Sequence, residues 1–217
     1  MSTYCLSDPH GERDRFHAVL KAAAFGKHDR LFILGDVIDR GPESIELLQD
    51  VLALPGAVLL RGNHEQMMLE ALAPESPPTA LTKWANNGGE QTLCRFLTLS
   101  PGRRKELLKS LGALPDAFNL RVADKTFHLV HGMPSDDSYL RLWGRVEAGA
   151  DCRLPGQDAV VFGHTPTWLY SAQLLDGHCR IWRGAGVIGI DCGCGHLQFP
   201  RRRLACLRLE DMEEFYA

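Results

Sequence analysis

Five short segments of the sequence combine carboxylates, imidazoles, an amide and an arginine at spacings that could hold metal ions and a phosphate. They are Asp8-Pro9-His10-Gly11, Gly35-Asp36-Val37-Ile38-Asp39-Arg40-Gly41, Gly62-Asn63-His64-Glu65, His131-Gly132 and Gly163-His164-Thr165. Carboxylate oxygen and imidazole nitrogen together suit Mn, Fe or Zn better than Ca or Mg. Two such ions about 3.5–4 Å apart, bridged by a carboxylate, are a recurrent device for in-line attack on phosphate esters. The segments therefore predict a two-metal site for phosphate chemistry.

Each segment also has a purely structural interpretation. Asp36 and Asp39 could cap the helix that follows them, with Arg40 facing water. A single histidine after a strand is more often a core or loop residue than a ligand. Because all five segments follow apolar, strand-like runs, five unrelated loops are the weaker explanation, and the set as a whole favours a site.

The elements around these segments predict how they come together. Strand-like runs at 3–7, 31–34 and 57–60 alternate with helical spacing at 12–25, 43–52 and 66–73. This β-α-β-α-β-α order predicts a parallel sheet with right-handed crossovers. Open α/β sheets bind their ligands at the carboxyl ends of such strands, where these polar loops would lie.

The rest of the chain predicts a helical insertion and a second sheet. Residues 74–114 contain prolines and then helical stretches without a strand signal, which indicates an insertion or cap that could shape the substrate cleft. Runs at 118–122 and 126–130 predict a hairpin, 142–145 a loop and 159–162 another buried strand. The tail, 179–209, predicts a second sheet made largely of antiparallel strands. We expect one domain over residues 1–217, of α/β (α+β) class, with two stacked mixed sheets flanked by helices.

Composition limits the class of protein. The chain has 217 residues, 45% hydrophobic and 24% charged, as in an ordinary globular domain. Its net charge of −3 gives no basic field for nucleic acid. There is no basic-then-apolar leader, and no apolar run approaches the ~20 residues that span a bilayer. We therefore expect a cytoplasmic protein that binds no membrane and keeps its seven cysteines reduced.

Taken together, the five segments resemble the signature blocks of calcineurin-like metallophosphoesterases. More narrowly, they resemble the phosphoprotein phosphatase branch, and within it the bacterial and lambda-phage serine/threonine phosphatases. The run Asn63-His64-Glu65-Gln66-Met67-Met68 and the stretch from Trp84 to Asn87-Gly88-Gly89 add to this likeness. The resemblance implies the metallophosphoesterase β-sandwich. One departure is Ser7, where the first block usually has glycine, and there we expect a local backbone adjustment with the metal retained.

The resemblance implies a role for each site residue. The expected metal ligands are Asp8 and His10 for one ion, Asp36 as the bridge, and Asn63, His131 and His164 for the other. The ions are expected to be manganese, with iron or zinc as alternatives. A metal-bridging hydroxide would attack phosphorus in line, with His64 as the general acid and Asp39 orienting it. Arg40 and Arg145 would bind the phosphate.

The first expected function is a two-metal phosphomonoesterase of a bacterial cytosol, a serine/threonine and possibly also tyrosine protein phosphatase. Its partner would be a phosphorylated protein or a small phosphoester. A symmetrical dinucleoside tetraphosphatase is the alternative, and Asp39 before Arg40 and Glu65 after His64 favour the phosphatase by resemblance. A non-catalytic scaffold with this fold ranks lowest because no ligand is missing. The sequence does not indicate the oligomeric state.

Overall fold

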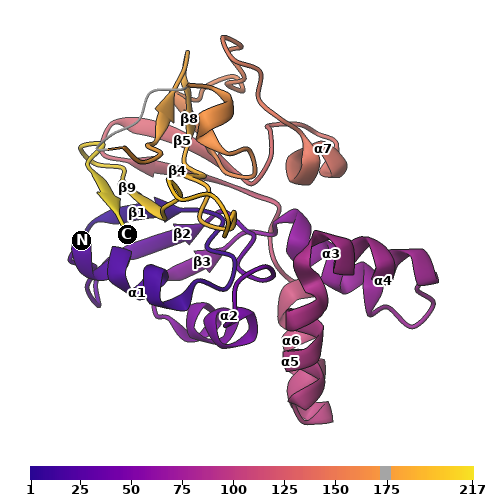
Figure 1. Ribbon diagram of the computed structural model, residues 1–217. Helices are drawn as coiled ribbons and strands as arrows, with labels where there is room; N and C mark the ends of the chain where they lie inside the picture. The colour runs from indigo at the N-terminus through magenta and orange to yellow at the C-terminus, as the bar shows by residue number, and fades with distance from the viewer. Residues whose placement is uncertain (172–176) are drawn as a thin grey trace.

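The computed structural model describes residues 1–171 and 177–217, which form two five-stranded sheets stacked face to face (Figure 1). The first sheet has the order β10-β9-β1-β2-β3. Its strands are β1 (Thr3–Leu6), β2 (Arg30–Ile33), β3 (Ala57–Leu59), β9 (Ala205–Arg208) and β10 (Glu214–Tyr216). β1, β2 and β3 are parallel, as the sequence predicts, and β9 and β10 extend the sheet in antiparallel fashion.

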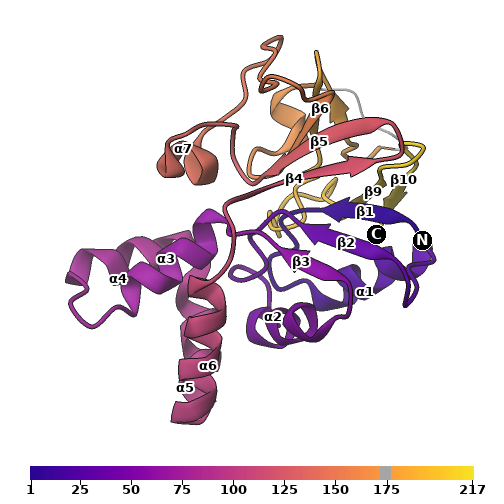
Figure 2. The same cartoon turned by 180° about the vertical axis from the view of Figure 1, so that it is seen from behind.

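The first sheet packs against helices on one face and against the second sheet on the other. Helices α1 (Arg13–Ala22) and α2 (Ser44–Ala53) cover its outer face (Figures 1 and 2). Leu6 and Ile33 pack in the cluster that includes these helices, whereas Cys5 and Phe32 pack in the cluster shared with the second sheet. Successive residues of a strand point to opposite faces, so β1 and β2 are apolar on both sides.

The second sheet has the order β4-β5-β6-β8-β7. Its strands are β4 (Ala117–Val122), β5 (Lys125–Val130), β6 (Ala159–Phe162), β7 (Trp182–Arg183) and β8 (Val187–Gly189). β4 and β5 form the predicted antiparallel hairpin. β5, β6 and β8 are parallel to one another, so the sheet is mixed.

The prediction that the tail forms a largely antiparallel second sheet is wrong in two respects. β8 joins the second sheet parallel to β6, and β9 leaves that sheet to pair with β1 of the first. An apolar run shows that a strand is buried on both faces, but its direction depends on where the chain re-enters the sheet. The two stacked, mixed sheets of the predicted fold class are nevertheless confirmed.

The helices that come between the two sheets along the chain lie beside the stacked sheets and do not cover them. They are α3 (Asn63–Ala71), α4 (Pro78–Trp84), the π-helical turn η1 (Ala85–Gly89), α5 (Glu90–Thr98) and α6 (Pro101–Gly112). In Figures 1 and 2 α5 and α6 overlap and project away from the sheets. Only the inner end of this arm, near η1, approaches the loops at the carboxyl ends of the strands.

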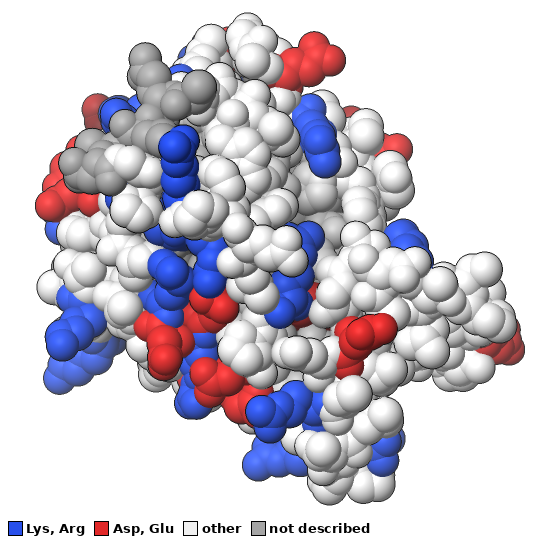
Figure 3. Space-filling view, viewed as in Figure 1, with Lys and Arg blue, Asp and Glu red and all other residues white. Residues whose placement is uncertain are grey.

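Two of the differences between predicted and observed helix boundaries lie at the site. α3 begins at Asn63, three residues before the predicted start, because the side chain of Glu65 accepts a hydrogen bond from the N–H of Gly62 and closes the first turn. The first two residues of the predicted loop at 142–145 instead form the end of α7 (Ser138–Trp143), whose first turn is capped by Asp137. No helix in the described ranges is long and apolar enough to cross a membrane. Acidic and basic side chains are intermixed over the face in Figure 3, as the near-balanced composition leads one to expect.

Candidate functional site

The loops that leave β1, β2, β5 and β6 converge with the start of α3 at one edge of the sheet stack. The structure brings together all six side chains that the sequence proposes as metal ligands: Asp8, His10, Asp36, Asn63, His131 and His164. Five of them are buried and His164 is partly exposed. Residues as distant in sequence as Asp8 and His164 are joined directly, since the carboxylate of Asp8 accepts the backbone N–H of His164 at 3.0 Å.

Asp36 lies at the centre of this group. Its Oδ2 is 3.4 Å from Nε2 of His131, 3.6 Å from Nε2 of His10 and 3.9 Å from Nε2 of His64. Two sets of possible ligand atoms share this carboxylate, one with His10 and His64 and the other with His131 and His164. A carboxylate common to two sets is the arrangement that a bridge between two cations requires.

The amide of Asn63 faces the same space. Its Oδ1 lies 2.9 Å from Nε2 of His131 and 2.9 Å from Nδ1 of His164. Carbonyl oxygen and two imidazole nitrogens at such distances can surround one ion. The position of Asn63 in the first turn of α3, rather than in a loop, holds this amide on a rigid element.

Backbone carbonyls orient two of the buried imidazoles. Nδ1 of His10 lies 2.9 Å from the carbonyl of Ile38, and Nδ1 of His131 lies 2.6 Å from the carbonyl of Leu34. A carbonyl only accepts, so each ring carries a proton on Nδ1, and its Nε2 is the nitrogen that faces the site. This is the usual way in which a histidine is prepared as a metal ligand.

Ser7, the departure from the usual first block, contacts a site residue directly. Its hydroxyl donates to Oδ2 of Asp8, and Ser7 is not among the residues with positive φ. The next residue, Asp8, has a positive φ of 57°. Gly163 makes room for the pair, because a side chain at position 163 would collide with the Ser7 hydroxyl and the Asp8 carboxylate.

The site loops adopt an unusual backbone conformation. Most non-glycine residues of the described chain with positive φ are site residues: Asp8, His10, Asp36, Asp39, Arg40 and His164. This left-handed region is strained for residues with a Cβ atom, and such strain collects at functional sites. The loops hold each other in place, since the N–H of His10 donates to the carbonyl of Asp36 at 3.0 Å and that of Gly41 to the carbonyl of His10 at 3.0 Å.

Glu65 fixes the loop of Asp36 against α3. Its two carboxylate oxygens accept four backbone N–H groups, those of Asp36, Gly62, Val37 and Ile38, at 2.8–3.3 Å. Glu65 is fully buried, and all four of these hydrogen bonds come from backbone N–H groups. The sequence analysis included Glu65 in a motif but assigned it no role.

The buried charges of the site favour the binding of a cation. Burial raises the pKa of Asp36, but the neighbouring imidazoles of His131 and His64 outweigh burial and hold it well below the ordinary value. Burial lowers the pKa of His131, and the carboxylates of Asp36 and Asp8 outweigh this and raise it to about 10. The pKa of Asp8 is raised well above its ordinary value by burial and by Asp191. Buried carboxylates that attract a proton onto a neighbouring imidazole suit divalent cations, so the donor set fits the metal ions that the family implies.

The proposed acid His64 lies beside Asp36, and Arg40, one of the two proposed phosphate-binding arginines, contacts His64. Nδ1 of His64 is 2.7 Å from Oδ2 of Asp39, and Nη2 of Arg40 is 3.0 Å from Nε2 of His64. A guanidinium only donates, so Nε2 of His64 is the acceptor here and its ring proton is on Nδ1, facing Asp39. Arg145 is exposed and makes no ion pair with the described residues. Its charge acts on His164. Burial, followed by the charges of His131 and Arg145, lowers the pKa of His164 to about 3.

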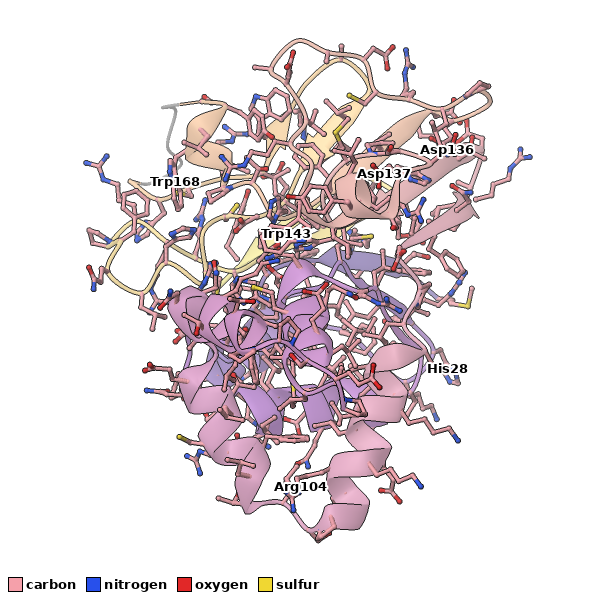
Figure 4. All side chains as sticks on the ribbon, turned by 90° about the vertical axis from the view of Figure 1, so that its right-hand side faces the viewer. His28, Arg104, Asp136, Asp137, Trp143 and Trp168 are labelled. Atoms are coloured by element: carbon pink, nitrogen blue, oxygen red, sulfur yellow. The ribbon has the colours of Figure 1, made fainter. Side chains whose placement is uncertain are left out.

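Aromatic rings form one wall of the site. Trp143 packs edge-on to His164 with ring centroids 6.1 Å apart, and Nζ of Lys83 lies 4.6 Å from the centre of the Trp143 ring. Figure 4 shows Trp143 at the junction between the second sheet and the helices of the insertion, with Asp136 and Asp137 farther out. Lys83 comes from α4 and Trp143 from α7, so this contact joins the insertion to the second half of the fold.

Comparisons with known proteins agree with this geometry. The family model for calcineurin-like phosphoesterases matches residues 1–187. The symmetrical bis(5'-nucleosyl)-tetraphosphatase of Escherichia coli O1:K1 / APEC is 31% identical over 149 residues, which are 64% of this chain and 52% of that protein. The match thus spans about half the length of this curated relative.

Solved structures show the same fold. A protein provisionally assigned as a diadenosine tetraphosphatase superimposes with a TM-score of 0.65 at 18% identity, covering 99% of this chain and 92% of the other. A cold-active protein-tyrosine phosphatase of a psychrophilic Shewanella species gives a TM-score of 0.57 at 16% identity, covering 99% and 80%. At such identities the likeness concerns the fold alone.

Proposed function

Because the chain belongs to the calcineurin-like phosphoesterase family, we propose that it is a metal-dependent hydrolase that cleaves phosphoric esters or anhydrides with the residues gathered around Asp36. The observation that carries this proposal is the position of Asp36 Oδ2, within 3.4–3.9 Å of three imidazole nitrogens from three different segments. We assign the metal ligands as the resemblance implies: Asp8, His10, Asp36, Asn63, His131 and His164. Two divalent ions, manganese by expectation, would supply an activated water nucleophile and neutralise charge on the phosphoryl group.

The chain's own residues then bind the phosphate and move the proton. Arg40 and Arg145 bind phosphoryl oxygens, for which a planar guanidinium offers paired donors. When Arg40 turns to the phosphate, it releases Nε2 of His64, which can then carry a proton to the leaving oxygen. Asp39 stabilises the imidazolium through Nδ1 and keeps the ring aimed at the leaving group.

The relatives bear on the substrate. The sequence analysis placed a serine/threonine protein phosphatase first and a symmetrical dinucleoside tetraphosphatase second. The curated relatives are symmetrical tetraphosphatases, and they support the second of these better than the first. We therefore propose dinucleoside tetraphosphates as the first candidate substrates.

A phosphate monoester, such as a phosphorylated protein side chain, is the second candidate. The observation that favours it is the 2.7 Å pair between His64 and Asp39. Departure of an alkoxide requires a well-placed proton donor, whereas a nucleoside diphosphate leaves as a weak base and needs one less.

A paired assay of the manganese-loaded protein tests both levels of the proposal. Diadenosine tetraphosphate and a phosphoserine peptide are supplied at equal concentration, and the products are separated by chromatography. Faster formation of ADP as the sole nucleotide product supports the tetraphosphatase, whereas faster release of phosphate from the peptide supports the monoesterase. No turnover of either substrate by protein with bound metal would refute the hydrolase and favour a scaffold.

A further inference from the structure

The indole of Trp84, at the end of α4, donates a hydrogen bond into the proposed catalytic pair. Its Nε1 lies 2.8 Å from Oδ2 of Asp39, the oxygen that also accepts from Nδ1 of His64 at 2.7 Å. Trp84 and Asp39 are both fully buried. A tryptophan Nε1 can only donate, so the contact is a charge-assisted hydrogen bond to a carboxylate shielded from water.

The orientation of Asp39 depends on these two donors. Its other oxygen, Oδ1, is buried and has no hydrogen-bond partner among the described residues. The side-chain hydrogen bonds that oppose rotation of the carboxyl group therefore come from His64, which is the group to be positioned, and from Trp84. Of these two donors, Trp84, at the end of α4, is the one that can hold the carboxyl group in place.

The same short stretch of the insertion also holds the backbone on either side. The N–H of Asp39 donates to Oγ1 of Thr92 at 3.2 Å, and that of Arg40 to the carbonyl of Gly88 at 3.0 Å. Both Asp39 and Arg40 have positive φ, which costs energy and persists only where neighbours enforce it. Side chain and backbone of this loop are thus held by residues 84–92.

Gly89 gives the indole its place. A Cβ atom at position 89 would collide with Nε1 and the adjoining ring carbons of Trp84. The backbone of Gly89 is right-handed helical (φ −78°), so it allows alanine, and the three atoms nearest to an added Cβ all belong to the indole. This provides a way to displace the indole without removing it.

We propose that Trp84 is a positioning residue that holds Asp39, and through it His64, in the geometry for protonating the leaving group. The inference rests on the proposed function, in which His64 is the acid. In the step that Trp84 assists, the water oxygen bonds to phosphorus as the bond from phosphorus to the ester oxygen breaks. The proton on Nε2 of His64 passes to that ester oxygen.

This role predicts a loss that depends on the leaving group. p-Nitrophenolate leaves without needing a proton, whereas phenolate is more basic and benefits from the acid. In Trp84→Phe, which keeps an aromatic ring but lacks the N–H, kcat on phenyl phosphate should fall about tenfold or more, since a charge-assisted bond is lost. On p-nitrophenyl phosphate the loss should stay within about twofold. Gly89→Ala should show the same selectivity.

Trp182→Phe is the matched control. Trp182 lies in β7 of the second sheet, and its ring stacks on that of Tyr170 with ring centroids 4.3 Å apart. Its indole N–H makes no hydrogen bond with the described residues. This variant should lose little on either ester. Circular dichroism and bound metal per chain should match the wild type in all variants that are compared.

A spectroscopic readout tests the positioning without turnover. In the zinc-loaded protein, which is diamagnetic, the Nδ1 proton of His64 gives a ¹H NMR signal that is assigned by its absence in His64→Asn. That signal should shift in Trp84→Phe and in Gly89→Ala and remain in place in Trp182→Phe.

Two outcomes would overturn the inference. One is an equal loss on both esters in Trp84→Phe while His64→Asn remains selective, which would leave the proposed function standing. The other is an unchanged Nδ1 signal in Trp84→Phe. If the wild type hydrolyses neither these esters nor diadenosine tetraphosphate, the proposed function fails instead, and the NMR result alone decides whether Trp84 positions the pair.

Discussion

Replacement of Glu65 by glutamine should loosen the loop that carries Asp36. Oε2 of Glu65 accepts the N–H groups of Asp36 at 2.8 Å and Gly62 at 2.9 Å, and Oε1 accepts those of Val37 at 2.9 Å and Ile38 at 3.3 Å. All four partners are donors, so only an ionised carboxylate satisfies them. A glutamine of the same shape must turn its NH₂ group toward two N–H groups, whichever way the amide is placed.

The size of the effect follows from these bonds. A buried donor left without a partner costs about 1–3 kcal/mol, so two cost about 2–6 kcal/mol. Part is recovered, because burial and the charge of Asp36 raise the pKa of Glu65 and make its ionised form unfavourable. The amide will also prefer the Oε1 side, where one bond is already long. We expect a net loss of about 2–4 kcal/mol, and at roughly 2–4 °C per kcal/mol for a chain of this size Tm should fall by about 4–16 °C.

Thermal unfolding of the metal-free protein, followed by circular dichroism, measures this directly. Glu70→Gln is the matched control. Glu70 lies on the same helix with its side chain 45% exposed, bonded to Gln66 at 2.9 Å, and its loss should cost within about 0.5 kcal/mol. If Glu65→Gln unfolds within a degree of the wild type, the four N–H groups do not depend on the carboxylate and the argument fails.

Three further predictions concern the metal, the acid and the pH dependence of stability. Asp36→Asn should weaken manganese binding by more than about 100-fold in a calorimetric titration, because it halves the negative charge available to both ions; unchanged affinity would contradict the bridging role. His64→Asn should keep both metals yet lose far more turnover on phenyl phosphate than on p-nitrophenyl phosphate, and equal losses would count against His64 as the acid. Burial and then the charge of Arg141 lower the pKa of His128, so below about pH 6.5 the unfolded chain binds a proton that the folded chain does not. Stability should therefore fall as pH drops below 6.5, and the Tm of His128→Gln should fall less between pH 7 and pH 5 than that of the wild type.

The site could be predicted from the sequence because its residues follow strands. Parallel strands bring their carboxyl ends to one edge, so polar residues such as Asp8 and Asp36 meet there however long the connecting helices are. His131 and His164 follow β5 and β6, which are also parallel, and this adds them to the same edge. The type of each residue and its place after a strand were enough to collect the candidates, whereas the role expected of each came from the family resemblance.

Other features depend on contacts that a local pattern does not contain. The direction of β8 and the departure of β9 to the first sheet depend on how the chain returns, and short apolar runs read alike in either direction. The positive φ angles of Asp39 and Arg40 are enforced by neighbouring residues. Neither residue is a glycine, the residue type that would indicate such a conformation in the sequence. The stretch from Trp84 to Gly89 was noted only as part of a likeness, since nothing in it shows that an indole 45 residues away reaches Asp39.

That bond bears on which substrate the site handles. A dinucleoside tetraphosphate releases a nucleoside diphosphate, a weak base, so an acid held by two further buried residues gives it little advantage. An alkyl monoester or phenyl phosphate releases a stronger base, and there the proposed alignment of His64, Asp39 and Trp84 would lower the barrier. The curated relatives point to the anhydride, whereas the buried pair of bonds to Asp39 Oδ2 points to the ester. If anhydrides are the substrate, Trp84→Phe should leave their turnover nearly unchanged, so the variant distinguishes the two reactions within one protein.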